Sequence, residues 1–275
     1  LWDRLRVDIK QDEVTSIFKL ESSLLPVLLE MKTKGVRVDI DGAEKIQKDL
    51  QIREKKLLEE IRADTGVTVE PWAAASVAKA FDALGLKYHR TEGTDAPSFT
   101  KQFLSNHPHP IAKKIVKLRE FNKANTTFVE TILEHSCNGR IHCDFNPLRS
   151  DEGGTVTGRF SSSHPNLQQI PARDPEIKSM IRGLFLPEEG TQWGSFDYAS
   201  QEPRWLAHYC AQLTGVHRHP QIDNVINMYH EGNADFHQMV ADLADITRKE
   251  AKTVNLGIMY GMGRKKLAGV MDIDE

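Results

Sequence analysis

The sequence predicts an α+β fold, with helices in both halves of the chain and a small antiparallel sheet between them. Three observations lead to this class. Apolar residues recur at helical spacing along much of 12–137. Short extended segments bounded by glycine and proline begin near Asn138. Two more helical patterns follow, over 235–243 and 247–260. At 275 residues the chain is long enough for two or three subdomains.

The first half contains four predicted helices. The first covers 12–34 and stops at Gly35. After the extended VRVDI, Asp41 and Glu44 have the spacing of a capping box, which predicts the start of a second helix that ends at Gly66.

A third, shorter helix is predicted over 76–85, and a loop of Gly, Thr, Pro and Ser follows at 91–98. The fourth helix runs from Pro110 to about Leu133. This helix carries a basic cluster, which is typical either of a solvated helix face or of a phosphate-binding surface. Its members are Lys113, Lys114, Lys117, Arg119 and Lys123.

Strands are expected in the middle of the chain. GRIHCDFNP (139–147) has the pattern of a strand, and the polar TGRFSSSHPNLQQIP (157–171) is typical of a loop. TQWGSFD (191–197) is predicted to be a strand that leads into a helix over 202–211. The histidine-containing region 213–232 is expected to be irregular.

Composition excludes several classes of protein. Charged residues make up 27% and hydrophobic residues 39%, as in ordinary globular proteins. No apolar run approaches the roughly 20 residues of a membrane span and no signal pattern opens the chain, so we expect no membrane partner and a cytoplasmic location. Three scattered cysteines are too few for a disulfide framework or a thiolate zinc site. The net charge of −3 argues against a uniformly basic surface but permits local basic patches.

The segment from Thr247 has the strongest chemical pattern. Thr247 and Glu250 form a capping box, so unpaired N–H groups and the positive end of a helix dipole attract anions there. A row on one helix face could hold a triphosphate and then a base, although an ordinary basic amphipathic helix has the same pattern. Gly257 and Gly261 favour close approach by another group or a helix end. The row consists of Arg248, Lys252, Leu256 and Tyr260.

Two other segments contain candidate residues. A carboxylate at a strand end, as predicted for Asp197, is suited to Mg²⁺ in phosphoryl transfer, but such residues also cap the following helix. Glu202 shares a face with Asp197 only if the turn between them allows it. Arg159 lies among hydroxyls and amides, which suit minor-groove acceptors and phosphates, and which are equally common in a polar surface loop.

Together these segments resemble family A DNA polymerases over nearly the whole chain. TGRFSSSHPNLQQIP resembles the family's loop before the palm strand, DYASQEPR (197–204) its motif A, commonly DYSQIELR, and RKEAKTVNLGIMYG (248–261) its motif B. FKLESSLLPVLLEMKTKGVRVD (18–39) resembles the entry to the thumb, and GRIHCDFN the strand that joins thumb and palm. The wording QEPR is similar to that of phage members, which predicts a phage-type enzyme.

The resemblance implies the organisation of a right-hand polymerase, with a linker over 1–11, a helical thumb over 12–137, a partial antiparallel palm sheet over 138–212 and part of the fingers over 213–275. It implies template-directed DNA synthesis, in which dNMP from a dNTP is added to a primer 3′-hydroxyl by two-metal phosphoryl transfer with Mg²⁺. The expected partners are primer–template DNA and dNTPs, in the cytoplasm of a bacterium or of a phage-infected host.

The resemblance also assigns roles to individual residues. Asp197 and the Tyr198 carbonyl are implied metal ligands, Asp197 and Lys252 are implied catalytic residues, and Glu202 is the implied steric gate against a 2′-hydroxyl. The implied dNTP-binding residues are Tyr198, Glu202, His237, Arg248, Lys252, Leu256 and Tyr260. The implied DNA-binding residues are Lys123, Arg159, Asn166, Gln169 and Arg204.

Two departures from the family pattern matter. Leu256 stands where the best-known members have Phe or Tyr, so packing against the incoming base and sugar is expected to be weaker. The family's second catalytic Asp belongs to a downstream His-Asp-Glu motif that does not appear. Since the chain also opens on Leu1 and stops at Glu275 after a basic run, we expect a piece of a longer protein that does not polymerise alone.

Three alternatives stay open at this point. The first is a catalytically inactive, nucleic-acid-binding remnant of the same fold. The second is a metal-dependent phosphatase that uses Asp197, for which 235–237 is the other candidate group. The third is a single-subunit RNA polymerase, the nearest relative in mechanism.

Overall fold

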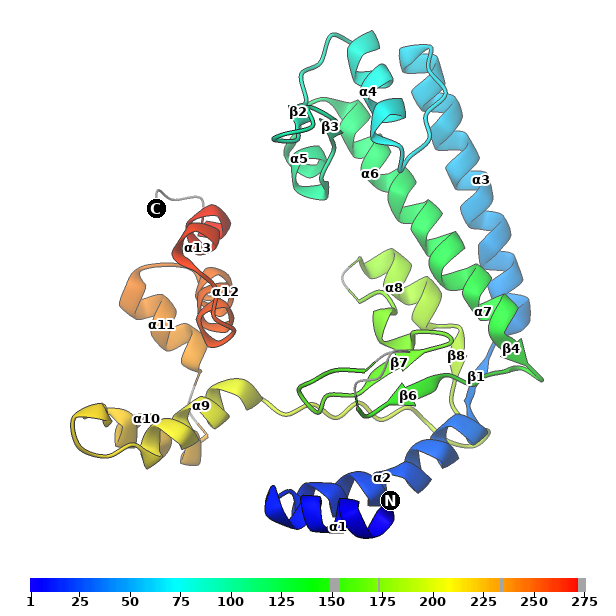
Figure 1. The fold of residues 1–275 in the computed structure, drawn as a ribbon. Coiled ribbons are helices and arrows are strands. Elements are labelled where there is room, and N and C mark those ends of the chain that lie inside the picture. Colours follow the sequence, from blue (N-terminus) through cyan, green and yellow to red (C-terminus); the bar gives the residue numbers. More distant parts are fainter. Residues whose placement is uncertain (149–153, 173, 233–234, 272–275) are drawn as a thin grey trace. The chain divides into compact units, whose positions relative to one another are not determined.

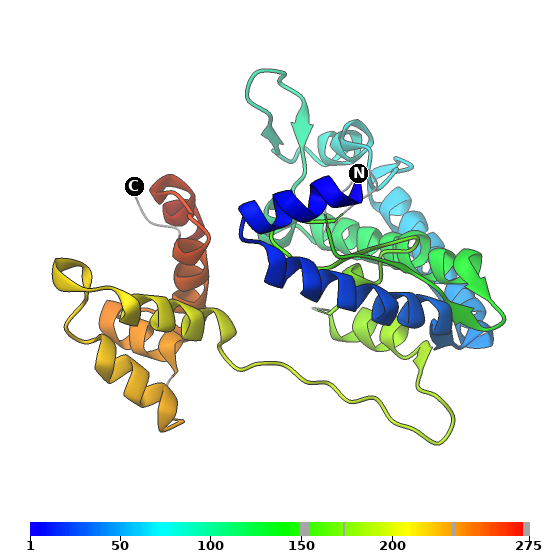
Figure 2. The ribbon, with the colours of Figure 1, turned by 60° about the horizontal axis from the view of Figure 1, so that its bottom comes forward.

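The computed structural model describes residues 1–148, 154–172, 174–232 and 235–271. It divides into two compact units, Leu1–Trp193 and Gly194–Glu275, which are described one at a time. Figures 1 and 2 show the ribbon from two directions. Helices dominate both units and the strands form small antiparallel sheets, which confirms the α+β prediction. Among the described helices, none is long and apolar enough to cross a membrane.

The first unit begins with α1 (Trp2–Gln11) and α2 (Thr15–Lys34), so the segment expected to be a linker contains a helix. As predicted, α2 stops at Gly35, where φ is +63°. A Cβ atom at this position would lie 2.7 Å from the carbonyl oxygen of Ile141. Glycine therefore permits both the positive φ and the close approach of Ile141 just before the following strand, β1 (Val36–Val38).

The N-cap of the long helix α3 (Ile40–Thr65) lies two residues earlier than predicted. Its N-cap is Asp39, whose Oδ1 accepts a hydrogen bond from the Gly42 N–H at 2.9 Å. Asp41, predicted to be the cap, lies inside the first turn, and that prediction was wrong because a neighbouring Asp fulfils the same requirement. Gly66 ends the helix in the left-handed conformation, as predicted.

A second long helical segment packs against α3 (Figure 1). It consists of α6 (Pro110–Lys123), the π-helical η1 (Ala124–Val129) and α7 (Glu130–His135). This segment confirms the fourth predicted helix, which contains an unforeseen π-helical section and extends to His135. Two antiparallel helices of this length can bury apolar side chains at both of their ends.

Two hydrophobic clusters lie along this helix pair. The outer cluster contains Ile61 of α3 with Ile115 and Leu118 of α6. The inner cluster contains Leu50 of α3 and Phe121 of α6. Leu57 packs against both clusters. The arm formed by α3 and by the helical segment from α6 to α7 therefore has a core at each end rather than one central core.

The outer cluster is closed by elements between α3 and α6. These are α4 (Ala74–Ala83), a hairpin of β2 (His89–Arg90) and β3 (Pro97–Ser98), and α5 (Lys101–Asn106). The predicted 91–98 loop is thus the turn and the whole second strand of this hairpin. The Phe81 and Phe99 rings lie 4.9 Å apart and join α4 to the hairpin.

The next elements of the first unit are β4 (Ser136–Cys137), β5 (Arg140–Ile141), β6 (Asp144–Asn146), β7 (Ser161–Ser163), η2 (Leu167–Gln169), α8 (Pro175–Arg182) and β8 (Phe185–Leu186). The inner end of the arm packs on a four-stranded antiparallel sheet with the order β4-β5-β1-β8. A separate pair, β6 and β7, forms a hairpin. The predicted strand 139–147 is therefore two strands, β5 and β6, in different sheets.

The strand predicted at 191–197 does not form, and this prediction was wrong. A strand needs a neighbour to bond its N–H and C=O groups, and none of the described segments pairs with these residues. Their apolar side chains are exposed, with Phe196 at 97%.

The second unit is helical. Its elements are α9 (Gln201–Gln212), η3 (Gly215–His217), α10 (Ile222–His230), α11 (Phe236–Ala244), α12 (Arg248–Met259) and α13 (Arg264–Met271). The prediction that 213–232 is irregular was wrong, because Ile222 and Tyr229 in α10 are buried in one cluster with Ala207 of α9. The helices predicted at 202–211, 235–243 and 247–260 are confirmed as α9, α11 and α12 to within a few residues.

The cap of α3 gives the first testable prediction. Asp39→Ala should lower the free energy of unfolding by about 1 kcal/mol, because it removes the acceptor for the Gly42 N–H. Asp41→Ala is the matched control, since it removes the same charge from the same turn but no cap. Urea unfolding followed by circular dichroism measures both, and an equal loss in the two variants would contradict the assigned cap.

Candidate functional site

The capping box predicted at the start of α12 is present. The Glu250 N–H donates to Thr247 Oγ1 at 3.3 Å, and Glu250 Oε2 accepts from the Thr247 N–H at 2.8 Å. Hydrogen bonds from Thr247 lower the pKa of Glu250, so this carboxylate stays ionised within its cap. The helix start is therefore fixed by its own side chains.

The predicted row on α12 faces outward. Arg248, Lys252 and Tyr260 are exposed and Leu256 is half-buried, whereas the neighbouring Ala251 and Asn255 are buried. Two cations, an apolar side chain and a phenol are thus accessible along one side of the helix. This arrangement can accept an anion at the helix start and a planar group farther along it.

Gly257 and Gly261 are required for different structural reasons. A Cβ on Gly257 would lie 3.0 Å from the side chain of Met262, so a residue of the same unit makes the close approach. Gly261 has φ of +73° and follows Tyr260, the C-cap of α12, so it belongs to the helix end.

Asp235 links the starts of α11 and α12. Its Oδ1 accepts from the Gln238 N–H at 3.1 Å as the N-cap of α11, while its Oδ2 accepts from Arg248 Nε at 2.8 Å. The bond from Arg248 and the cap bond lower the pKa of Asp235. Because Asp235 uses Nε, the two terminal nitrogens of Arg248 remain for another acceptor.

His237 lies beneath this exposed face. Its side chain is 7% exposed, and its Nδ1 lies 3.0 Å from Nδ2 of the buried Asn255. Burial lowers the pKa of His237, and the nearby charge of Arg248 lowers it further. The ring is therefore neutral near pH 7, unlike the exposed cations Arg248 and Lys252.

A hydrogen bond joins α9 to the end of α12. Tyr260 Oη donates to Glu202 Oε1 at 3.4 Å. The two residues come from segments more than fifty positions apart, so the fold brings together the regions that resemble motifs A and B.

The turn before α9 presents Asp197 and Tyr198 to solvent, with Tyr198 80% exposed. Asp197 does not cap α9, because the N-cap is Ser200 in the left-handed conformation with φ of +54°. Arg204 Nε donates to the carbonyl of Ala199 at 2.9 Å. This bond ties the turn to the helix that follows it.

Arg204 has a second contact, with its guanidinium 4.8 Å from the centre of the Tyr229 ring in α10. Although the resemblance implies a DNA contact for Arg204, its Nε and one face of its guanidinium are engaged within the unit. Its terminal nitrogens make no hydrogen bond with a described residue.

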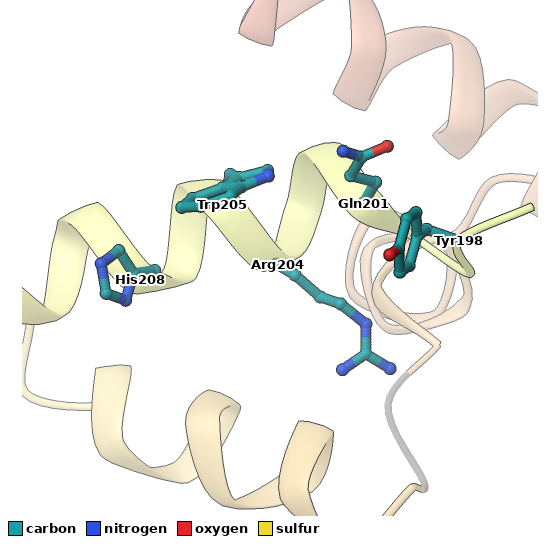
Figure 3. A pocket seen from close by; sticks show the side chains of 5 residues that line it. All are labelled: Tyr198, Gln201, Arg204, Trp205 and His208. Carbon is teal, nitrogen blue, oxygen red and sulfur yellow. The ribbon is translucent and has the colours of Figure 1, made fainter. Parts of the chain in front are cut away.

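An open groove of about 490 Å³ runs along α9 beside this turn. Figure 3 shows Gln201 and Trp205 on one side of the helix and Arg204 on the other, with Tyr198 near its start. The Trp205 ring stacks on Tyr209 with 6.0 Å between centres. Sequence analysis gave no role to these aromatic residues, although their spacing of four places them on one face.

The candidate metal site offers few protein ligands. No group of three or more His, Cys, Asp or Glu side chains gathers within the described part of the chain. The Asp197 carboxylate and the Tyr198 carbonyl are oxygen donors on an exposed turn. Mg²⁺ usually binds to one or two carboxylates and completes its coordination with water and substrate phosphates. The Asp197 carboxylate and the Tyr198 carbonyl therefore fit a Mg²⁺ ion whose other ligands are water and phosphate oxygens.

Three of the candidate DNA-binding residues lie in the first unit, in and after the β6–β7 hairpin. Arg159, Asn166 and Gln169 are all exposed. Asn166 Oδ1 accepts from Ser162 Oγ at 3.1 Å and from the Gln168 N–H at 3.0 Å. Asn166 therefore shapes its own loop with its oxygen, and its Nδ2 remains as a donor.

The basic cluster of α6 is largely used inside the first unit. Lys114 pairs with Asp64 at 2.8 Å and Lys117 with Glu176 at 2.9 Å. Arg119, whose pKa is lowered by burial, donates at 2.7 Å to two backbone carbonyls, those of Pro71 and Phe99.

Lys123 differs from these three cations, because it is exposed and forms no ion pair with a described residue. It lines a cavity of about 260 Å³ together with Trp72. Of the cluster, Lys113 and Lys123 are the exposed members.

Within the second unit, three hydrogen bonds hold predicted site residues in place: Tyr260 bonds Glu202, Arg248 bonds Asp235, and His237 bonds Asn255. The hydrogen bond between Asn255 and His237 was not predicted, although Asn255 lies in the segment that resembles motif B. The signal in the sequence was a polar residue four places after Ala251, on the same helix face as an apolar residue.

The sequence pattern of DNA polymerase family A matches residues 40–275. A DNA-directed DNA polymerase of Pseudomonas phage M6 is 38% identical over 94% of this chain and 41% of its own length. DNA polymerase DpoZ of Acinetobacter phage SH-Ab 15497 is 32% identical over 99% of this chain and 46% of its own length. The thermostable DNA polymerase I of Thermus aquaticus is 31% identical over 98% of this chain and 32% of its own length.

A solved structure described as the POL domain of Pol1 from M. smegmatis in complex with DNA primer-template and dNTP has the same fold, with a TM-score of 0.73. It is 23% identical and covers 92% of this chain and 44% of its own chain. The chain spans less than half the length of the curated relatives named above. The predictions of family A membership and phage type are confirmed.

The capping box gives a testable prediction. Thr247→Val keeps the side-chain shape but removes the cap oxygen, which should cost about 1 kcal/mol locally and speed amide exchange at Glu250 by roughly fivefold. Thr253→Val, also in α12, is the matched control, because its hydroxyl bonds only the Lys249 carbonyl. Hydrogen exchange measured by mass spectrometry or NMR distinguishes them, and unchanged exchange in Thr247→Val would contradict the capping role.

Proposed function

The chain belongs to DNA polymerase family A, and we propose that it forms the part of a longer polymerase that binds the dNTP and half of the catalytic metal site. In this proposal 1–11 is a linker, 12–137 the thumb, 138–212 part of the palm and 213–275 part of the fingers. The reaction adds dNMP to a primer 3′-hydroxyl on template DNA, in the cytoplasm of a bacterium or of a phage-infected host.

The observation that carries the proposal is the arrangement of α12. Its exposed face offers Arg248 and Lys252 near the helix start, while Tyr260 at its end donates to Glu202 of α9. The anion-binding start of α12, and Tyr260 at its end, which bonds the Glu202 carboxylate of α9, match a nucleotide, which has a triphosphate at one end and a sugar and base at the other. An ordinary amphipathic helix does not require the bond to Glu202.

The triphosphate is assigned to the helix start. Arg248 offers its two terminal nitrogens, because Asp235 holds Nε, and a guanidinium fork suits phosphate oxygens. Lys252, one turn later, contributes a second cation and is assigned the catalytic role of neutralising charge on the phosphates. His237 completes the phosphate contacts.

The sugar and base are assigned to the other end of the same face. Glu202, held by Tyr260, lies under the sugar and excludes a 2′-hydroxyl. Leu256 and Tyr260 contact the incoming and templating bases. Because Leu256 is aliphatic, stacking on the base is weaker here than with an aromatic residue.

The Asp197 carboxylate and the Tyr198 carbonyl would hold Mg²⁺. When bound, the two ions of the complete enzyme would supply activation of the primer 3′-hydroxyl and would stabilise charge on the α-phosphate and the leaving pyrophosphate. Asp197 contributes a fixed negative charge on an exposed turn, and Arg204 keeps that turn in place through the Ala199 carbonyl.

Primer–template DNA is assigned to the first unit and to Arg204. Arg159, Asn166 and Gln169 are exposed polar residues suited to minor-groove acceptors, where Asn166 would use Nδ2. Lys123 would contact a phosphate, and Arg204 would do so through its terminal nitrogens. The alternative function is a nucleic-acid-binding remnant of the fold that performs no catalysis, since only one catalytic carboxylate is assigned.

Primer extension with Mg²⁺ and dNTPs separates these functions. The complete natural protein that contains this chain should extend a primer, and Asp197→Ala should reduce the rate by about a thousandfold or more, because a metal ligand is lost. The 275-residue chain should bind primer–template DNA without extending the primer. Full activity in Asp197→Ala, or none in the complete protein, would support the inactive remnant.

Sugar selection is tested at Glu202. Glu202→Ala should increase ribonucleotide incorporation relative to deoxynucleotides by roughly 10- to 100-fold, because the group that meets the 2′-hydroxyl is removed. Competition assays with matched rNTP and dNTP measure the ratio, with Glu231→Ala, an exposed carboxylate after α10, as the control. Equal use of rNTPs and dNTPs by the unaltered protein would instead indicate an RNA polymerase.

A further inference from the structure

The second unit contains a buried polar pair that the proposed chemistry does not explain. Four polar residues are buried in the described part of the chain, and two of them, His237 and Asn255, bond to each other. Their exposed fractions are 7% and 6%, and the two nitrogens lie 3.0 Å apart. Burying a polar side chain is unfavourable unless it forms hydrogen bonds. The hydrogen bond between His237 and Asn255 therefore fixes how the two side chains face each other.

The hydrogen-bond chemistry of this pair determines the proton position on the ring. The amide nitrogen of Asn255 can only donate, so Nδ1 of His237 must accept and carries no proton. In a neutral imidazole the proton then resides on Nε2. An imidazolium, which has a proton on both nitrogens, would oppose the amide N–H.

Burial of the ring favours the same neutral state, while the nearby charges act in both directions. Arg248 and Lys252 from α12 disfavour a positive ring, whereas Asp235 beside it in α11 and Glu202 from α9 act in the opposite direction. Burial is the largest effect and also disfavours charge.

We propose that Asn255 is a positioning residue that holds His237 as the neutral Nε2–H tautomer, so that His237 donates a hydrogen bond from Nε2 to the dNTP triphosphate. This rests on the proposed function, because the triphosphate is the acceptor that His237 would meet beside Arg248. Asn255 itself does not touch the nucleotide. A neutral donor adds a directed hydrogen bond without a third positive charge, and it keeps dNTP binding insensitive to the ordinary titration of histidine.

The tautomer is measured without any polymerase activity. In the ¹⁵N-histidine-labelled 275-residue chain, long-range ¹H–¹⁵N spectra should show His237 as Nε2–H at pH 7.5, with the signal assigned from its loss in His237→Gln. Asn255→Asp should move the proton to Nδ1 and raise the pKa of His237, because a carboxylate accepts from Nδ1–H and stabilises the charged ring. An Nδ1–H ring in the unaltered chain would overturn the proposal, whatever the protein catalyses.

Kinetics of the complete natural protein test the consequence. In the unaltered enzyme the KM for dNTP should show no step that follows His237 titration between pH 6 and 8.5. In Asn255→Asp the KM should rise about tenfold at pH 8.5, where Nε2 has no proton, and return toward normal as falling pH protonates the ring. Asn255→Leu should raise KM at every pH, with a smaller effect on kcat.

Two controls isolate the ring. Asn224→Asp, which adds the same charge at an exposed position of α10, should leave the pH profile flat. Asn255→Asp combined with His237→Gln should lose the pH dependence seen in Asn255→Asp alone. A pH-independent KM in Asn255→Asp, with the tautomer reversed by NMR, would overturn the role of His237 toward the triphosphate while leaving primer extension itself established.

Discussion

The unpaired N–H groups at the start of each helix are the constraint on which much of this structure depends. A helix has no backbone acceptors for its first N–H groups, and in several helices of this structure a side-chain oxygen accepts there. Asp39 accepts such a hydrogen bond at the start of α3, and Thr247 accepts one at the start of α12. Asp235 accepts one at the start of α11, while its second oxygen orients Arg248. One carboxylate thus fixes both a helix start and a cation of the proposed triphosphate site.

The same constraint explains which parts could be predicted. Capping and helical spacing are local, so the Thr247 capping box and the row from Arg248 to Tyr260 were predicted from a few neighbouring residues. Properties that depend on a distant partner could not be predicted in this way. Residues 191–197 have the composition of a strand but pair with none of the described segments. Helix α10 was not predicted, because it is stabilised by packing on α9. Asn255 has the same limitation, because its role is defined by a histidine eighteen residues away.

The pattern of charged residues in the sequence was the least reliable guide to binding surfaces. The cluster of cations on α6 suggested a phosphate-binding surface, but Lys114 and Lys117 pair with carboxylates and Arg119 holds two backbone carbonyls. Sequence spacing shows where cations are, whereas only the fold shows which are already paired. The cations of α12 differ, since Lys252 is exposed and Arg248 keeps its terminal nitrogens after bonding Asp235.

The two hydrophobic clusters along α3 and α6 have an evolutionary consequence. Since the outer cluster shares only Leu57 with the inner one, substitutions or insertions between Gly66 and Pro110 disturb the packing at one end while the sheet end keeps its own core. The outer end of the arm can therefore accept sequence changes that leave the packing at the sheet end intact.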